Sequence, residues 1–293
     1  KTSYFSAQNS LFMRLYRKKA ALLQYLNEKK TSLGFVPTMG ALHQGHLSLV
    51  EKAVVENKLV VVSIFVNPTQ FNNPTDLENY PYSLTEDIEK LVPFEESLIL
   101  FVPTKEELYG RTVSADTYDF GSLAVHMEGA SRANHFLGVA TVVEKLFKLI
   151  NPQKAYFGEK DFQQLQIIKN LAKQKKWDIE IIGCPIIRET NGLAISSRNQ
   201  LLTPALKDKA AILHNTLLWV TKQSSKTKIS ALEKEVKRQF EKQQDFQLDY
   251  FCIAEEETLV PATEFSRNKS CRAFIAVNVC PIRLIDNMLL TKI

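Results

Sequence analysis

Apolar residues in the first two thirds of the chain form short runs that alternate with helix-like segments. The runs at 33–36 and 59–66 are apolar on both faces, as expected for strands buried inside a parallel sheet. The complete predicted series is strand 33–36, helix 47–57, strand 59–66, helix 85–91, strand 97–101, helix 138–149, strand 155–157, helix 163–175 and strand 178–182. This alternation predicts an α/β fold with a parallel sheet, helices on both faces, and ligand sites at the carboxyl ends of the strands.

The pattern changes after Cys184-Pro185. Two helical patterns, at 204–222 and 230–243, are followed by strand-like alternation at 248–254 and 272–279. We therefore expect two domains: residues 1–184, which contain the parallel sheet, and residues 185–293, a smaller α+β domain. The connection near Gly183-Cys184-Pro185 is the expected hinge.

Composition narrows the class of protein. The 293 residues are 45% hydrophobic and 24% charged, which is ordinary for a globular protein. The net charge of +5 comes from interleaved charges and not from a basic stripe, so a nucleic-acid surface is not expected. No apolar run has the length of a membrane span, and no signal core is present, which predicts a cytoplasmic protein. Cys184, Cys252, Cys271 and Cys280 lack metal-ligand spacing and are expected to be free thiols.

The most informative motif joins the first predicted strand to the next helix. Residues 36–47 read VPTMGALHQGHL, so a glycine-containing turn carries His43 and His46 into the start of a helix. The backbone N–H groups at such a junction, together with imidazole donors, suit a phosphate group. A pair of capping or surface histidines is the alternative.

Three more segments place polar side chains after predicted strands or after the hinge. Each has a simpler interpretation: an Asn-Pro turn, an ordinary strand-to-helix turn with a solvated lysine, and a capping loop rich in serine and asparagine. The candidate residues are Asn67 and Gln70 in the first segment, Gly158, Lys160 and Gln164 in the second, and Ser196, Ser197 and Arg198 in the third.

Together these segments resemble the pantoate–β-alanine ligase family over nearly the whole chain. The resemblance is carried by VPTMGALHQGH (36–46), SIFVNPTQF (63–71), FGEKDFQQ (157–164) and ISSRN (195–199). Weaker support comes from EGASR (128–132) with HF (135–136), and from RLIDN (283–287). The first motif is also similar to the His-x-Gly-His signature of the wider nucleotidyltransferase and class I aminoacyl-tRNA synthetase superfamily. The resemblance implies a Rossmann-like sheet and a two-step reaction. ATP and pantoate give pantoyl-adenylate and pyrophosphate, and the amine of β-alanine then displaces AMP to form pantothenate.

The resemblance further implies roles for individual residues. His46 is expected to donate a proton to the departing pyrophosphate, and the other expected catalytic residues are His43, Lys160, Ser197 and Arg198. The expected ATP site comprises Met39, Gly40, Ala41, Leu42, His43, Gln44, Gly45, His46, Gly158, Glu159, Lys160, Asp161, Ile187, Ile195, Ser196, Ser197 and Arg198. Gln70 and Gln164 are expected to bind pantoate, with Gln70 also near β-alanine. Mg²⁺ is expected to bridge the phosphates, with Asp87 as the candidate protein ligand, and the family implies a homodimer.

The chain departs from the family pattern at Tyr82, where arginine is usual, and at Ala133, where proline is common. Two other functions remain open on the residues alone: another nucleotidyltransferase of the same superfamily, or a non-catalytic nucleotide-binding module. Gln70 and Gln164 favour pantoate over other acceptors. The presence of both histidines with Lys160 and Arg198 favours an enzyme.

Overall fold

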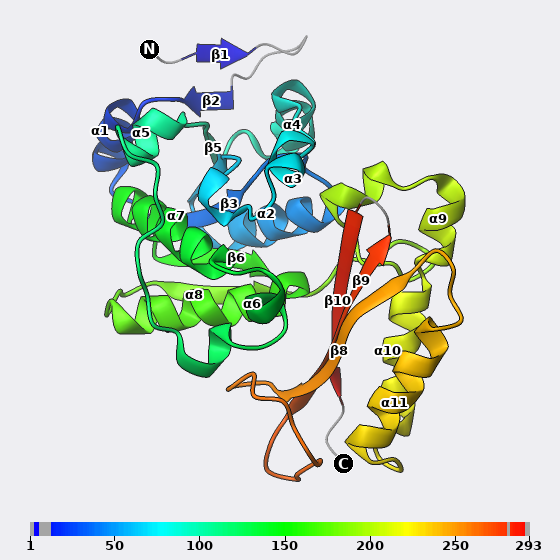
Figure 1. The fold of residues 1–293 in the computed structure, drawn as a ribbon. Helices are drawn as coiled ribbons and strands as arrows, with labels where there is room; N and C mark the ends of the chain where they lie inside the picture. The colour runs from blue at the N-terminus through cyan, green and yellow to red at the C-terminus, as the bar shows by residue number, and fades with distance from the viewer. Residues whose placement is uncertain (1–2, 6–12, 280–281, 291–293) are drawn as a thin grey trace. The chain divides into compact units, whose positions relative to one another are not determined.

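A computed structural model describes residues 3–5, 13–279 and 282–290 (Figure 1). The chain forms two compact units. Unit 1 comprises Lys1–Asp119, Ala133–Glu159 and Ile167–Pro185, and unit 2 comprises Phe120–Arg132, Lys160–Gln166 and Ile186–Ile293. The sequence predicts a division between residues 184 and 185. In the structure, two short internal segments, Phe120–Arg132 and Lys160–Gln166, also belong to the C-terminal unit. The domain boundary itself stays a prediction.

Unit 1 is built on a seven-stranded sheet with the order β1-β2-β5-β4-β3-β6-β7. All neighbours are parallel except β1, which runs antiparallel to β2. The strands are β1 (Ser3–Phe5), β2 (Met13–Tyr16), β3 (Leu33–Thr38), β4 (Leu59–Ile64), β5 (Leu98–Phe101), β6 (Lys154–Gly158) and β7 (Glu180–Cys184). The predicted α/β fold with a Rossmann-like parallel sheet is confirmed.

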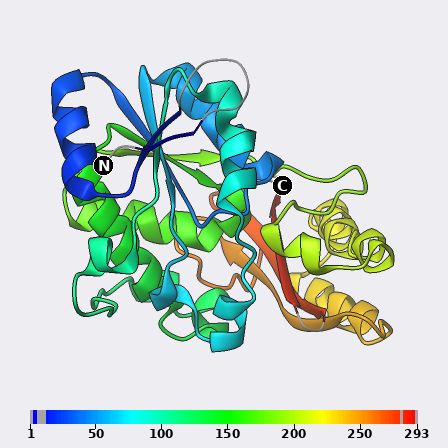
Figure 2. The same cartoon turned by 90° about the horizontal axis from the view of Figure 1, so that it is seen from above.

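Helices cover both faces of this sheet (Figure 2), because its central strands are apolar on both sides. Every residue of β4 is buried. Val36 and Val62 share a core cluster with Val50 of α2 (Gln44–Glu56). On the opposite face, the Phe35 ring meets Phe147 of α7 (His135–Ile150) edge-on, at 6.1 Å between ring centroids.

The other helices of unit 1 are mostly short. They are α1 (Lys19–Lys29), α3 (Pro74–Glu78), α4 (Leu84–Leu91), α5 (Lys105–Tyr109) and most of α8 (Phe162–Gln174), with 3₁₀ turns η1 (Pro68–Gln70) and η2 (Val92–Phe94). The 3₁₀ turn η4 (Glu159–Asp161) begins in unit 1 and ends in unit 2. A buried carboxylate ties α7 to its surroundings. Burial alone would raise the pKa of Glu144, but hydrogen bonds from Lys148, Tyr118 and Lys175 lower it to about 2.

Unit 2 contains an antiparallel sheet with the order β10-β9-β8. Its strands are β8 (Gln247–Glu255), β9 (Cys271–Val279) and β10 (Ile282–Leu290). One face packs on α10 (Ile212–Gln223) and α11 (Ile229–Phe240), in a core that includes Leu217, Val236 and Ile275. The remaining elements are η3 (Gly121–Ala124), α6 (Glu128–Ser131), η5 (Ser197–Leu201) and α9 (Pro204–Lys209). The sequence predicts a smaller α+β unit at the C-terminal end. The antiparallel sheet with two helices packed on one face agrees with this prediction.

Several elements differ from the sequence predictions. The predicted helix at 204–222 is two helices, α9 and α10, which separate at Ala210-Ala211. The strands β1, β2 and β10 and the helices α1, α3, α5 and α6 were not predicted. Among the cysteines, Cys184, Cys252 and Cys271 are free, as predicted, and Cys280 lies outside the described residues. No helix in the described ranges has both the length and the apolar character needed to cross a membrane.

Candidate active site

The turn between β3 and α2 has a backbone that few residues adopt. Gly40 has a φ of +84° and Ala41 a φ of +49°. A Cβ at Gly40 would lie 2.9 Å from an Asp87 oxygen, so glycine is required there both for φ and for space. The Thr38 hydroxyl donates to the Ser63 carbonyl at 2.8 Å and accepts the Gly40 N–H at 3.2 Å, which ties the turn to β4.

Asp87 and Lys90 of α4 hold the same turn. The two Asp87 oxygens accept the N–H groups of Ala41 at 3.0 Å and Leu42 at 2.6 Å, and the Lys90 ammonium donates to the Leu42 carbonyl at 2.9 Å. Asp87 is completely buried. Burial raises the pKa of its carboxyl, and the two backbone N–H groups act in the opposite direction. The sequence offered Asp87 as a metal ligand, whereas the geometry gives both of its oxygens the task of shaping the turn.

The two histidines lie together where α2 begins. The imidazole rings of His43 and His46 stack with centroids 4.0 Å apart and an interplanar angle of 26°. The His43 backbone N–H donates to Nδ1 of His46 at 3.4 Å, which assigns the proton of a neutral His46 to Nε2. A Cβ at Gly45 would lie 3.0 Å from the His43 ring. The structure therefore brings together the two imidazoles at the positive end of a helix, where negative charge is stabilised.

Half of the predicted ATP run 39–46 offers backbone and not side chains, because Gly40 and Gly45 have no side chain and Ala41 and Leu42 are buried. Ala41 and Leu42 are buried, and Leu42 belongs to the hydrophobic core. Gln44 is exposed, whereas Met39 and Gly45 are half-buried. Any contact of Ala41 or Leu42 with a ligand would come from the main chain.

Gln70 lies at the end of η1, after the adjacent strand β4. Its side-chain amide donates to the Met39 sulfur at 2.8 Å and accepts from Asn67 at 3.1 Å. Met39 and Gln70, which the sequence assigned to ATP and to pantoate, are therefore in direct contact. Neighbouring parallel strands β3 and β4 place both side chains at one edge of the sheet.

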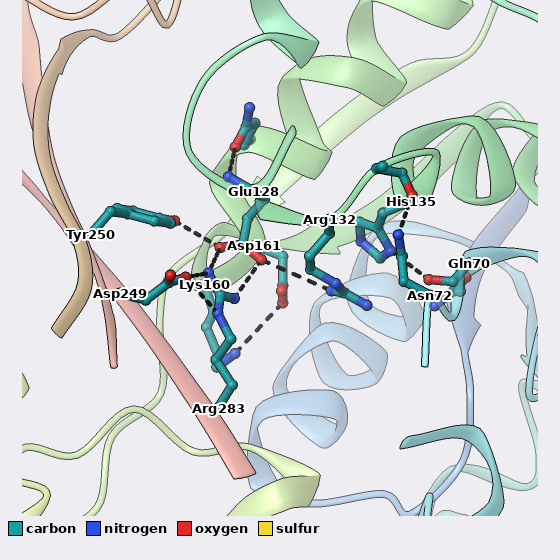
Figure 3. A network of polar contacts seen from close by, with 12 residues as sticks. Gln70, Asn72, Glu128, Arg132, His135, Lys160, Asp161, Asp249, Tyr250 and Arg283 are labelled. Carbon is teal, nitrogen blue, oxygen red and sulfur yellow. Dashed lines mark hydrogen bonds and ion pairs between the residues drawn. The ribbon is translucent and has the colours of Figure 1, made fainter. Parts of the chain in front are cut away.

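Hydrogen bonds to residues of α7 and α5 hold the η1 turn in place. The Nδ1 atom of His135 lies 2.7 Å from the Gln70 carbonyl, and Asn72 donates to the Ala133 carbonyl (Figure 3). Asn67, which is almost fully buried, donates to the Gly138 carbonyl at 3.1 Å and accepts from the Tyr109 hydroxyl at 2.6 Å. These supporting residues have no catalytic signature in the sequence, although His135 stands in the weakly family-like stretch after Arg132.

The Gly158–Asp161 segment begins with the last residue of β6, which lies beside β3 in the sheet. A Cβ at Gly158 would meet no heavy atom within 4 Å, so the space beside this backbone is open. In unit 2, the Lys160 ammonium lies 3.9 Å from an Asp161 oxygen, and 20% of the Lys160 side chain is exposed. Gln164 is half-buried on α8, whereas its neighbour Gln163 is buried and bonded to backbone groups of residues 123–128.

The third candidate segment is a short hairpin followed by η5, all in unit 2. Arg188 and Ala194 form an antiparallel bridge, and the Ile195 N–H donates to the Ile187 carbonyl at 3.0 Å, so the two predicted isoleucines are neighbours. The Ser196 hydroxyl accepts the Arg198 N–H at 3.3 Å and caps η5. The capping interpretation of this serine is therefore correct for its hydroxyl, while Ser197 is buried and Arg198 half-buried.

A buried ion pair holds another family-like segment within unit 2. Arg283 of β10 donates two hydrogen bonds of 2.8 Å to the carboxylate of Glu128, which also accepts from the Tyr250 hydroxyl at 2.8 Å (Figure 3). Burial opposes ionisation of Glu128, but the Arg283 guanidinium beside it holds its pKa below the usual range. Arg132 lies at the edge of this pair, 3.9 Å from Glu128.

No cluster of three or more histidine, cysteine, aspartate or glutamate side chains suitable for a metal ion occurs in the described part of the chain. Asp87 is fully buried, and both of its oxygens accept backbone N–H groups. The described residues therefore form no dedicated site that surrounds a metal ion. A Mg²⁺ ion that arrives on a triphosphate needs few protein groups, because it keeps water and phosphate ligands.

Comparisons with known proteins agree with one another. The model of the family described as pantoate-beta-alanine ligase matches residues 13–289. A pantothenate synthetase of Flavobacterium psychrophilum is 48% identical over 270 residues, covering 92% of this chain and 95% of the relative. Another from Bacteroides thetaiotaomicron is 40% identical over 268 residues, covering 92% and 94%.

Solved structures give the same result. A pantothenate synthetase of Thermus thermophilus superposes with a TM-score of 0.88 at 39% identity, covering 95% of this chain and 99% of its own. A pantoate-beta-alanine ligase of Francisella tularensis, complexed with beta-gamma ATP and beta-alanine, has a TM-score of 0.78 at 35% identity, with 94% and 97% covered. The chain belongs to the pantoate–β-alanine ligase family.

Proposed function

We propose that this chain joins pantoate to β-alanine at the expense of ATP, through a pantoyl-adenylate intermediate. The observation that carries the proposal is the junction of β3 and α2, where two stacked imidazoles begin a helix and Met39 contacts Gln70. This junction offers phosphate donors directly beside an amide suited to a hydroxy acid. Family membership and the Francisella structure complexed with beta-gamma ATP and beta-alanine support the same reaction.

In the first step, a pantoate carboxylate oxygen attacks the α-phosphorus, and the bond to the pyrophosphate oxygen breaks. The reaction needs positioning and charge stabilisation and no protein nucleophile. His46 donates from Nε2 to the departing pyrophosphate, and His43 faces the phosphates beside it. Lys160, Ser197 and Arg198 supply further positive charge and hydrogen-bond donors.

In the second step, the uncharged amine of β-alanine attacks the acyl carbon and forms the carbon–nitrogen bond. AMP leaves with the electron pair of the broken carbon–oxygen bond, and the amine nitrogen loses one proton to solvent. Gln70 and Gln164 hold the hydroxyl and carboxylate groups of pantoate, because each amide offers both a donor and an acceptor. Gln70 also contacts β-alanine. Gly158, Glu159, Asp161, Ile187 and Ile195 bind the nucleotide with the backbone of residues 39–45.

Three further points belong to the proposal. Mg²⁺ enters as part of MgATP and is held chiefly by the phosphates, since the described residues provide no ready cage. The protein works as a homodimer, as the family implies. It acts in the cytoplasm, on the evidence of its sequence alone.

The test is a steady-state assay of pyrophosphate and AMP release from MgATP, with pantoate and β-alanine added singly and together. Pyrophosphate formation with pantoate alone, and sustained AMP release only with both, is the expected result. If folded protein releases no pyrophosphate in response to pantoate, the proposed function is wrong. Transfer of the nucleotide to a stable product would then identify a different nucleotidyltransferase.

A further inference from the structure

Two adjacent side chains on β10 hold the two segments of unit 2 that carry proposed phosphate-binding residues. The side chains belong to Asp286 and Asn287, which are 3% and 2% exposed. Adjacent residues of a strand point to opposite faces of the sheet. Leu284 and Leu290 belong to the core that α10 and α11 cover, and Asp286 shares their face, whereas Asn287 lies on the other.

Asn287 holds the turn that contains Lys160. Its side-chain N–H donates to the Lys160 carbonyl at 2.9 Å, and its side-chain oxygen accepts from Arg272 at 2.6 Å. The Arg272 guanidinium also lies 3.8 Å from the centre of the Phe162 ring, two residues after Lys160. The Lys160 backbone is therefore fixed to the sheet by a buried amide, and the next residues are fixed by ring packing.

Asp286 holds the hairpin that leads to Ser196–Arg198. Its carboxylate receives two hydrogen bonds from the Arg188 guanidinium, at 2.7 and 3.0 Å, and the same guanidinium donates to the Gly192 carbonyl at 3.0 Å. Arg188 thereby joins one arm of the hairpin and its turn to β10. The fit is tight, because a Cβ at Gly192 would lie 2.3 Å from the His214 ring on α10.

The Asp286 and Asn287 attachments are linked to each other on β10. The Asn287 backbone N–H donates to an Asp286 oxygen at 2.8 Å, and η5, which begins at Ser197, packs against β10. Donors to a developing negative charge work only when they are fixed in advance, and a misplacement of about 1 Å costs about 100-fold in rate.

We propose that Asp286 and Asn287 are positioning residues, which hold the Lys160 turn and the Ser196–Arg198 loop in place from opposite faces of one strand. The inference rests on the proposed function, which gives these two segments their phosphate-binding role. Neither side chain contacts the substrate in this proposal; each acts through the segment that it holds.

The test begins with Asn287→Leu and Asp286→Asn, compared with Asn278→Leu. Asn278 lies on β9, on the same face as Asn287, and its neighbours across the sheet are Gln247 and Arg283. We expect each β10 variant to lower kcat for pantoate-dependent pyrophosphate release about 10- to 100-fold, with an unchanged KM for β-alanine. The Asn278→Leu protein should keep wild-type kinetics. If Asn287→Leu does not fold, Asn287→Ser provides the same measurement with a smaller polar side chain.

Double-mutant cycles separate positioning from general damage. If Asn287 acts through the Lys160 turn, Asn287→Leu should change kcat less than about twofold in a Lys160→Ala background. Asp286→Asn should behave in the same way in an Arg198→Ala background. Effects that multiply in full in both backgrounds, or single variants with wild-type kinetics, overturn the inference. Failure of the proposed function can be distinguished from failure of this inference. In the first case, the wild-type protein itself would release no pyrophosphate with pantoate.

Discussion

Replacing Gly138 with alanine tests how closely α7 supports the proposed pantoate site. A Cβ at this position would lie 2.1 Å from the Thr69 carbonyl oxygen, 2.4 Å from its carbon and 2.6 Å from the Gln70 nitrogen. All three contacts are backbone atoms, so no rotamer change relieves them. The helix or the η1 turn has to move by about 1 Å for the contacts to reach van der Waals separation.

Two effects of opposite sign decide the stability of the Gly138→Ala protein. Alanine inside a helix is favoured over glycine by about 1 kcal/mol. Overpacking against a fixed backbone costs about 3 kcal/mol, the upper end of the usual range. We expect a net loss of about 2 kcal/mol, which lowers the melting temperature by roughly 4–8 °C. Because Gln70 moves with η1, the KM for pantoate should rise more than the KM for ATP.

Thermal unfolding and pantoate titrations of the activity measure both effects, and Gly158→Ala is the matched control. A Cβ at Gly158 meets no atom within 4 Å, so this variant should keep the wild-type melting temperature while its affinity for ATP falls. A Gly138→Ala protein that is as stable as wild type and has an unchanged KM for pantoate would refute the reasoning. Equal destabilisation by both substitutions would do the same.

Three other predictions follow from the site and its surroundings. Lys160→Ala and His46→Ala should each lower kcat for pyrophosphate release about 10²- to 10³-fold, as for loss of one fixed donor, and near-wild-type turnover would remove that role. Gln164→Ala should weaken pantoate binding in calorimetry far more than ATP binding; equal losses would contradict the assignment. The ionised Glu144 should add stability above about pH 5 that disappears as the pH falls towards its pKa of about 2, by at most about 3 kcal/mol. Urea unfolding at pH 7 and pH 3 should therefore show a larger loss in the wild-type protein than in Glu144→Gln, and parallel losses would exclude this linkage.

The sheet of unit 1 could be predicted from sequence because its central strands are short, rich in valine and isoleucine and apolar on both faces, and because helical segments alternate with them. β10 was missed because Asp286 and Asn287 interrupt its apolar positions. Their burial depends on Arg188, Arg272 and the Lys160 carbonyl, none of which is local to the strand. Long-range pairing of this kind leaves no periodic signal in the chain.

The candidate site was predictable to a similar extent. His43 and His46 stand close together in sequence at a strand-to-helix junction, so their proximity follows from local geometry. The support of the turn by Asp87 depends on a helix more than 40 residues away, so the sequence did not reveal it. The role of Asp87 as a Mg²⁺ ligand stays a prediction. The division of 204–222 into two helices was also missed, because neither glycine nor proline marks the break at Ala210-Ala211.

The burial of β4 has a consequence for making the protein. Its six residues, LVVVSI, combine high β-propensity with no charge, and such a segment pairs readily with other chains while it is exposed. β4 lies between β3 and β5 in a parallel sheet, and parallel pairing closes slowly because the partners are far apart in sequence. Lys58 immediately before the strand and Pro68 shortly after it flank this aggregation-prone segment, as gatekeeper residues do. During refolding from denaturant, β4 can pair with other chains until both neighbouring strands have covered it. The refolding yield should therefore be highest at low protein concentration.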